Sequence, residues 1–496
     1  MRGPLNTTLA CRCTDQPPQR NCPLHPFSLR PAMNASPLLS AVTSSTLPQA
    51  DNLKGAPLRR TCAASGVAVA LALWAGGAQA QSLVDLFNSA RTFDATYQSA
   101  KAAYDATQAK ADQARAGLLP SVGLSGGASR SSVDNASPVA DRSFGSQNVA
   151  VAASHPLYRP ANKLVFEQGQ KSLVVAQAQL KAAEQDLIVR TTQAYFDVLA
   201  AQDTLTFVNA QKAAVAEQLA AAKRNFEVGT STVTDSREAQ ARFDLVLAQE
   251  IAAENDLRVK KLALDTLVGK SNTSPQPLAL PVDLPLAVPD DVNHWVNLAE
   301  TSHPAVQQAQ TALEIAQLET RKAEAGLGPT VDLTAQYQVS RAPSTALNGN
   351  TLRSNTASVG VQLNLPLFAG YALQNRVKET LALEEKSRAD MEAARRTVPQ
   401  ATRAAFFGVQ SGKGQVRALE AAEASSQSAL DANKLGYQVG VRINIDVLNA
   451  QSQLFQTKRD LAKARYDVLV GGLKLRQASG NLVADDLNAV NALVKP

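Results

Sequence analysis

The stretch SVGVQLNLPLF, residues 358–368, alternates between apolar and polar side chains. In an extended strand its valines and leucines lie on one face, and its serine, glycine, glutamine and asparagine lie on the other. Residues 331–340 alternate in the same way. About 9–11 residues are enough for a strand to cross a membrane in a tilted barrel. The pattern therefore predicts membrane strands, and a soluble sheet is the alternative.

The chain repeats itself at a distance of about 210 residues. GLLP at 117–120 recurs as GLGP at 326–329, and FEVG at 226–229 recurs as YQVG at 437–440. Chance similarity between alanine-rich helices would not also align proline and glycine. We expect a first repeat at 81–269, a joining segment at 270–305, a second repeat at 306–480 and a C-terminal helical segment at 481–496.

Each repeat is expected to hold a helix, two strands, a very long helix, a turn and a further helix. The expected strands are about 119–130, 147–158, 329–341 and 355–368, and the expected helices after them are 161–226, 233–268, 372–434 and 444–478. The first long helix has apolar seams on nearly opposite sides at a spacing of seven residues, which indicates a neighbouring helix on each side. Pro399 predicts a bend in the second long helix.

Four membrane strands cannot close a barrel, and an open sheet edge in lipid leaves backbone groups unpaired. The chain must therefore assemble. Two copies would give eight strands with a filled interior, and three would give twelve strands with room for a channel. The residues alone leave the number of copies open.

Residues 1–80 read as a leader with a signal peptide. Arg59 and Arg60 precede a short apolar run, and Ala78-Gln79-Ala80 predicts cleavage after Ala80. Either Met1 or Met33 could be the true start. All four cysteines lie in this leader, so we expect neither a disulfide nor a lipid anchor in the mature chain. Three of them, with His25, only superficially resemble zinc ligands.

Charge and motifs exclude other classes of function. The net charge of +6 comes largely from the leader, so nucleic-acid binding is not expected. His155, His294 and His303 form no metal-ligand or catalytic-triad pattern. The sequence therefore predicts no enzyme, no metal and no cofactor.

Several motifs resemble the TolC family of outer-membrane efflux proteins. They are LPLFAG at 365–370, GYQVGVR at 436–442, DVLNAQ at 446–451 and LNAVNAL at 487–493. The resemblance implies an α+β membrane protein, a homotrimer with a 12-stranded β-barrel in the lipid of the outer membrane. A 12-helix periplasmic tunnel would continue from it, closed at its inner tip. An inner-membrane transporter and a periplasmic adaptor protein would dock there.

The resemblance also implies functional residues at the two helix-hairpin turns. Asp446 would line the pore constriction, where three copies form a ring of carboxylates that selects cations. The family often has a second aspartate one turn later, but here that residue is Asn449. Tyr437 and Arg442 would hold the tip closed by polar links to Thr234 and Asp235.

Simpler interpretations stay open for these residues. The aspartates could only stabilise first helical turns, where carboxylates favour the helix dipole, and the tyrosine and arginine could only be solvated. The predicted function is the exit duct of a tripartite efflux or type I secretion system. The alternative is a periplasmic helical adaptor or structural protein without a pore.

Overall fold

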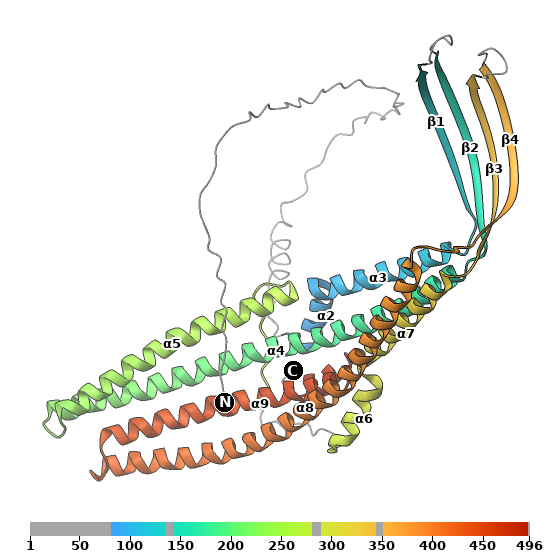
Figure 1. Ribbon diagram of the computed structural model, residues 1–496. Coiled ribbons are helices and arrows are strands. Elements are labelled where there is room, and N and C mark those ends of the chain that lie inside the picture. The colour runs from blue at the N-terminus through green and yellow to red at the C-terminus, as the bar shows by residue number, and fades with distance from the viewer. Residues whose placement is uncertain (1–80, 135–141, 280–288, 344–350, 495–496) are drawn as a thin grey trace, which may run out of the picture. The chain divides into compact units, whose positions relative to one another are not determined.

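The computed structural model describes residues 81–134, 142–279, 289–343 and 351–494 (Figure 1). The chain divides into residues 1–75 and 76–496, and only the second unit is described below. The predicted leader therefore lies outside the described residues, and its cleavage stays a prediction.

The described elements follow the order expected for two repeats. The first repeat contains α2 (Leu83–Phe93), α3 (Ala95–Ala116), β1 (Ser121–Val133), β2 (Arg142–Tyr158), α4 (Pro160–Glu227) and α5 (Val233–Val268). α6 (Val292–Ser302) lies in the expected joining segment. The second repeat contains α7 (Pro304–Ala325), β3 (Thr330–Pro343), β4 (Thr351–Asn364), α8 (Ala372–Gln438) and α9 (Asn444–Ala478), followed by α10 (Asp486–Asn491). The 68 residues of α4 extend roughly 100 Å at 1.5 Å per residue. The predicted α+β fold with an internal repeat is confirmed.

The strands form one antiparallel sheet in the order β1-β2-β3-β4. Directly opposite residues share a face, so the register places the apolar side chains of all four strands together. The central rows of this face hold Val122, Leu124, Val149, Val151, Ala153, Leu333, Ala335, Tyr337, Val359 and Val361. The opposite face holds Gly123, Ser125, Asn148, Ser154, Thr334, Gln336, Gln338, Ser358, Gly360 and Gln362. The register thus gathers the apolar residues of the first-repeat strands on the same face as those of the second repeat.

The sheet has two free edges within one protomer. β1 pairs only with β2, and β4 pairs only with β3, among the residues described. The apolar face is also uncovered, since Val359 is 78% exposed and Leu124 is 75% exposed. A sheet with these properties needs lipid on one face and a neighbouring strand at each edge.

β4 ends at Asn364, four residues short of the end predicted for the strand at about 355–368. Its last residue, Asn364, pairs with Thr330, which is the first residue of β3. Among the described residues no strand lies opposite residues 365–368, although their alternation continues, and Pro366 lacks an N–H to donate. Tyr371 then has a φ of 63°, which turns the chain into α8.

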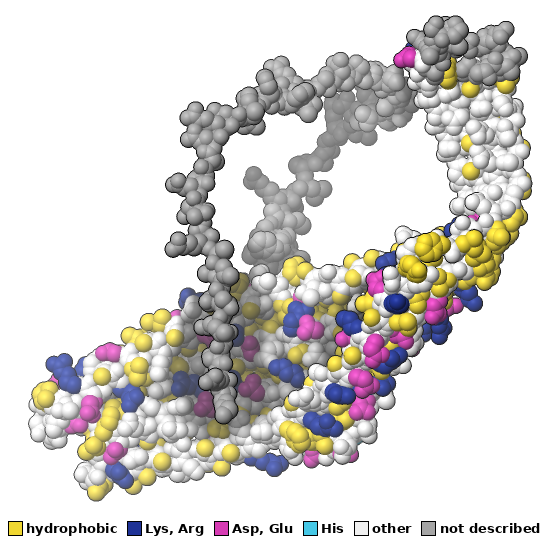
Figure 2. Space-filling view, viewed as in Figure 1, with side chains coloured by type: hydrophobic (Ala, Val, Ile, Leu, Met, Phe, Trp, Pro, Cys, Tyr) yellow, Lys and Arg dark blue, Asp and Glu magenta, His cyan; other side chains and the backbone are white. Residues whose placement is uncertain are grey.

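The long helices pair as two antiparallel hairpins, α4 with α5 and α8 with α9 (Figure 1). α4 also packs against α9, which joins the two hairpins. α4 therefore has neighbours on both sides, as its two apolar seams indicated. Figure 2 shows Lys, Arg, Asp and Glu side chains scattered over the helices and few of them on the visible face of the sheet. Within the described ranges, none of the helices has both the length and the apolar character that a membrane crossing requires.

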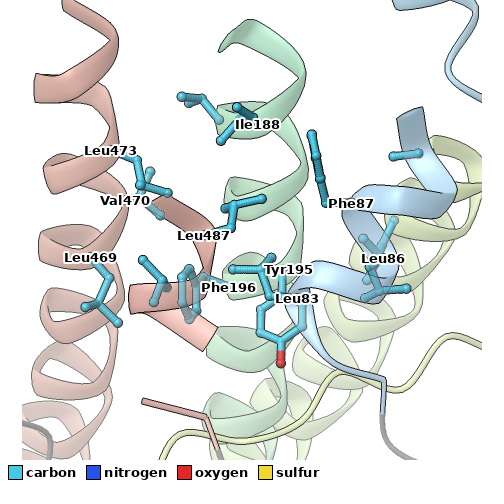
Figure 3. Close-up of a cluster of buried hydrophobic side chains, with 14 of the residues drawn as sticks. Leu83, Leu86, Phe87, Ile188, Tyr195, Phe196, Leu469, Val470, Leu473 and Leu487 are labelled. Carbon is cyan, nitrogen blue, oxygen red and sulfur yellow. The ribbon is translucent and has the colours of Figure 1, made fainter. Parts of the chain in front are cut away.

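The largest apolar core joins both hairpins to the terminal helices. Leu83 of α2 lies beside Tyr195 of α4, and Phe87 of α2 faces α4 near Ile188 (Figure 3). Leu469, Val470 and Leu473 of α9 and Leu487 of α10 close the same cluster. Each of these side chains contributes about 1.5–3 kcal/mol by its burial, so this core fixes the middle of the helical wall.

α8 runs through Pro399 without interruption and appears as a curved ribbon in Figure 1. Pro399 is buried. The neighbouring Val398 packs against Ala299 of α6 and Val306 of α7. These contacts hold the helix together where a backbone hydrogen bond is missing.

Candidate pore constriction and gate

Two turns close the helix hairpins at the end that lies far from the strands. Residues 228–232 join α4 to α5, and residues 439–443 join α8 to α9. Gly229 and Gly440 have φ values of 76° and 80°, a conformation that side chains with a Cβ rarely adopt. Together these turns are called the tip below.

α5 begins with a self-contained cap. The Asp235 N–H donates to Thr232 Oγ1 at 3.2 Å, and the Thr232 N–H donates to Asp235 Oδ2 at 3.1 Å. This reciprocal arrangement satisfies two backbone donors that a helix start would leave free. Thr234 lies exposed on the same turn. The carboxylate of Asp235 therefore has a structural role in this protomer.

α9 begins differently, with charged and polar side chains on its first two turns. The guanidinium of Arg442 lies 3.6 Å from Asp446 Oδ2. One turn further along, Asn449 Oδ1 accepts a hydrogen bond of 2.8 Å from Nη2 of Arg242, which belongs to α5. Both residues proposed for the constriction are thus partnered by arginines.

Tyr437 contacts the other hairpin through a residue that the sequence did not indicate. Asn225 Nδ2 donates to the Tyr437 hydroxyl at 3.3 Å. Within the described part of the protomer, Tyr437 and Arg442 thus bond to Asn225 and Asp446 rather than to Thr234 and Asp235. The links to Thr234 and Asp235 stay a prediction.

Asn444 is the most buried polar side chain at the tip, with 1% of its surface exposed. Its Oδ1 accepts a hydrogen bond from Gln218 of α4, and its Nδ2 donates to the Asp235 carbonyl at 3.4 Å. The helix start beside it, Ile443, has no side-chain cap. Asn444, the first residue of α9, is therefore used to join the hairpins.

Leu448 adds an apolar contact to this joint. It is fully buried and packs with Val215 and Ala222 of α4 and Ala239 of α5. The tip is therefore held by one apolar cluster and by amide hydrogen bonds that cross between the hairpins.

A separate link between α4 and α9 lies far from the tip. The Tyr466 hydroxyl donates to Asp203 Oδ2 at 2.6 Å. Burial raises the pKa of the Asp203 carboxyl, and the bond from Tyr466 partly offsets that rise. Burial also raises the pKa of Tyr466, so the hydroxyl keeps its proton and remains a donor.

The profile of the outer membrane efflux protein family matches the chain twice, at residues 86–270 and 295–481. The two matches coincide with the two repeats. The chain belongs to the outer membrane efflux protein family. The predicted TolC-type resemblance is confirmed, and the protein is an outer-membrane exit duct that extends into the periplasm.

Relatives of this efflux protein include channels and secretion proteins. Outer membrane protein TolC of Vibrio cholerae serotype O1 is 32% identical over 430 residues, which cover 86% of this chain and 97% of the relative. Proteases secretion protein PrtF of Dickeya chrysanthemi is 30% identical over 434 residues, covering 84% and 92%. The structure of the Campylobacter jejuni CmeC outer membrane channel has a TM-score of 0.70 at 15% identity, covering 85% and 92%.

Family membership sets aside the alternative of a periplasmic adaptor without a pore. The efflux family consists of outer-membrane channel proteins.

Within the ranges that the structure describes, no group of three or more His, Cys, Asp or Glu side chains is placed to hold a metal ion.

Proposed function

We propose that three copies of this efflux protein close into a 12-stranded barrel, with β4 of each copy pairing with β1 of the next. The amphipathic sheet carries this proposal. Its central rows are apolar on one face and polar or small on the other, and each protomer leaves two strand edges unpaired. Closure pairs those edges, places the apolar face in lipid and lines the interior with polar groups.

The helical hairpins of the three copies would form the periplasmic tunnel below the barrel. Each protomer supplies four long helices, and α4 and α9 already pack side by side as parts of one wall. A periplasmic adaptor and an inner-membrane transporter are the proposed partners at the tip. The cargo is then whatever the transporter delivers, whether drugs, other small molecules or secreted proteins.

The tip is the proposed gate, and Asp446 the proposed constriction. Tyr437 and Arg442 would hold the gate by links to Thr234 and Asp235. An adaptor and transporter would open it by binding the open form more tightly. Contacts between the hairpins support this proposal, since the buried Asn444 and the Asn225–Tyr437 bond join them at the tip.

Planar-bilayer recording of detergent-extracted protein tests the proposal. The protein should run as a heat-sensitive trimer and form channels. Asp446→Ala should change the ratio of cation to anion permeability and weaken block by multivalent cations, because three carboxylates leave the pore. A stable monomer that retains its sheet would contradict the barrel, and an unchanged permeability ratio would remove Asp446 from the constriction.

A further inference from the structure

Arg242 of α5 brings a positive charge to Asn449 of α9. Asn449 itself is neutral, and its Oδ1 accepts a hydrogen bond of 2.8 Å from Arg242. The hydrogen bond brings a guanidinium from α5 to the start of α9, on the same helix face as Asp446, one turn away. On α5, Glu238 lies one turn before Arg242 and Asp244 lies two residues after it, but in the described protomer Arg242 forms an ion pair with neither of them, and Asp244 accepts a hydrogen bond from Gln240 instead.

Nearer the turns, the charged groups are paired differently. There Asp446 is paired with Arg442, and the Asp235 carboxylate is engaged by Thr232. Asp235 lies seven residues before Arg242 on α5, which is about 10 Å along the helix. That distance exceeds the Debye length of about 8 Å at physiological ionic strength, so Asp235 screens Arg242 only weakly.

We propose that Arg242 determines the ion selectivity of the duct, by adding a ring of positive charge one turn inside the Asp446 ring. The inference rests on the proposed function, in which Asp446 lines the constriction. In a trimer, three Arg242 side chains join the three Arg442 guanidinium groups in offsetting the carboxylates near the tip. The duct then passes anionic cargo as readily as cationic cargo, and its potassium-to-chloride permeability ratio is close to one.

Asn449 is the residue that positions this arginine. An amide oxygen holds a guanidinium in place without neutralising its charge, whereas a carboxylate would form an ion pair with it. The presence of asparagine at this position therefore preserves the positive ring.

Reversal potentials in a salt gradient across planar bilayers test the role of Arg242. A unit charge within several ångströms of an ion changes its relative concentration by about threefold even in bulk water. Arg242→Gln should therefore raise the potassium-to-chloride permeability ratio at least about threefold. Arg258→Gln is the matched control, because Arg258 is a highly exposed arginine of the same helix that pairs with Glu254 of that helix. It lies about 24 Å further along α5, so its loss should leave the ratio unchanged.

A cysteine variant keeps the test independent of the folding of Arg242→Gln. Residues 81–496 contain no cysteine, so Arg242→Cys supplies a single thiol that can be modified in an assembled, conducting channel. A cationic thiosulfonate reagent should restore the parent ratio. An anionic reagent should shift the ratio further toward potassium.

The outcomes separate this inference from the proposed constriction. If Asp446→Ala changes the ratio while Arg242→Gln and both modified thiols leave it unchanged, Arg242 lies outside the ion path and the inference fails alone. If neither residue affects the ratio, the constriction proposal fails with it. A threefold rise for Arg242→Gln with an unchanged Arg258→Gln control supports the inference.

Discussion

At the scale of single residues, the tip is joined by amides more than by ion pairs. Asn444 and Asn225 each bond across the hairpins, whereas the carboxylates of Asp235 and Asp446 are partnered within their own hairpins. A neutral hydrogen bond contributes about 0.5–1.5 kcal/mol, but an unpaired buried group costs about 1–3 kcal/mol. Burial therefore makes Asn444 the most sensitive polar position of the gate.

Asn444→Ala should open the tip. The substitution leaves the Gln218 amide and the Asp235 carbonyl without their partner, at a cost of about 2 kcal/mol in each copy. The cost summed over three copies, about 6 kcal/mol, is enough to move a two-state equilibrium from 1:99 to 99:1, which takes roughly 5.5 kcal/mol. Single-channel conductance should rise, and cells should become permeable to large antibiotics.

Tyr466→Phe is the control for this prediction, because it removes one α4–α9 hydrogen bond far from the tip. Conductance of Tyr466→Phe should stay at the parent level with an intact trimer. The proposed gate links predict a rise also for Tyr437→Phe combined with Arg442→Ser. Equal conductance of the Asn444→Ala and parent trimers would show that apolar packing around Leu448 closes the tip alone.

The sequence indicated where the site lies but only some of the side-chain contacts within it. The repeat and the glycines of the two turns pointed to the tip, and the motif around Asp446 pointed to the constriction. The roles of Asn444 and Arg242 depend on which side chain of one hairpin faces the other. That pairing is set by the relative placement of α5 and α9, which no local pattern in either helix encodes.

At the scale of elements, the turn glycines and the periodicity of apolar residues predicted where most helices and strands lie. Glycine at 229 and 440 ended both long helices within a few residues of their expected limits. The expected strand at 355–368 extended beyond the observed end at Asn364. Alternation of apolar and polar residues indicates which side chains share a face, but it does not show where the partner strand ends. The contacts of Val398 hold α8 intact through Pro399, and such tertiary contacts cannot be read from the helix alone.

Glu319 ties three helices together. Its carboxylate on α7 accepts hydrogen bonds from Gln168 of α4 at 2.9 Å and from Arg376 of α8 at 2.8 Å, and it also pairs with Lys322. Partial burial acts to raise the pKa of the Glu319 carboxyl, but these partners outweigh it and lower the pKa to about 2. The ionised form is therefore favoured by folding.

Glu319→Gln should lower thermal stability in a pH-dependent way. A lowered pKa gives stability that is present above the ordinary pKa near 4.5 and is lost as pH falls toward 2. We expect a loss of about 1 kcal/mol per protomer at neutral pH, small because the site is partly exposed. The difference in melting temperature from the parent should shrink as the pH falls from 5 toward 2.

Glu385→Gln is the control, since Glu385 is 69% exposed and pairs with Arg388 of its own helix. It should melt close to the parent at every pH. A pH-independent difference for Glu319→Gln would show that its effect comes from packing rather than from its charge.

At the scale of the whole molecule, one register fixes both the membrane face and the assembly. The same cross-strand pairs that gather Leu333, Tyr337 and Val359 on one face leave β1 and β4 as edges. The sequence alone gave four strands but left the number of copies open, because strand count per chain does not fix how many chains close a ring. Membership of the outer membrane efflux protein family favours three chains in the ring.

A pair of neighbouring lysine substitutions in β4 tests this arrangement. Val359 lies on the apolar face beside Ala335, and Ser358 lies on the opposite face beside Gln336. Val359→Lys places a charge in lipid near the middle of the strand, at a cost of about 2–4 kcal/mol per copy. Ser358→Lys places the same charge in the water-filled interior, where it alters ion flow and costs little. The trimer should therefore dissociate at a lower temperature in Val359→Lys, while Ser358→Lys should melt like the parent and conduct differently. Equal destabilisation by both would mean that the two faces meet the same environment, and a trimeric barrel with a polar lumen would then be excluded.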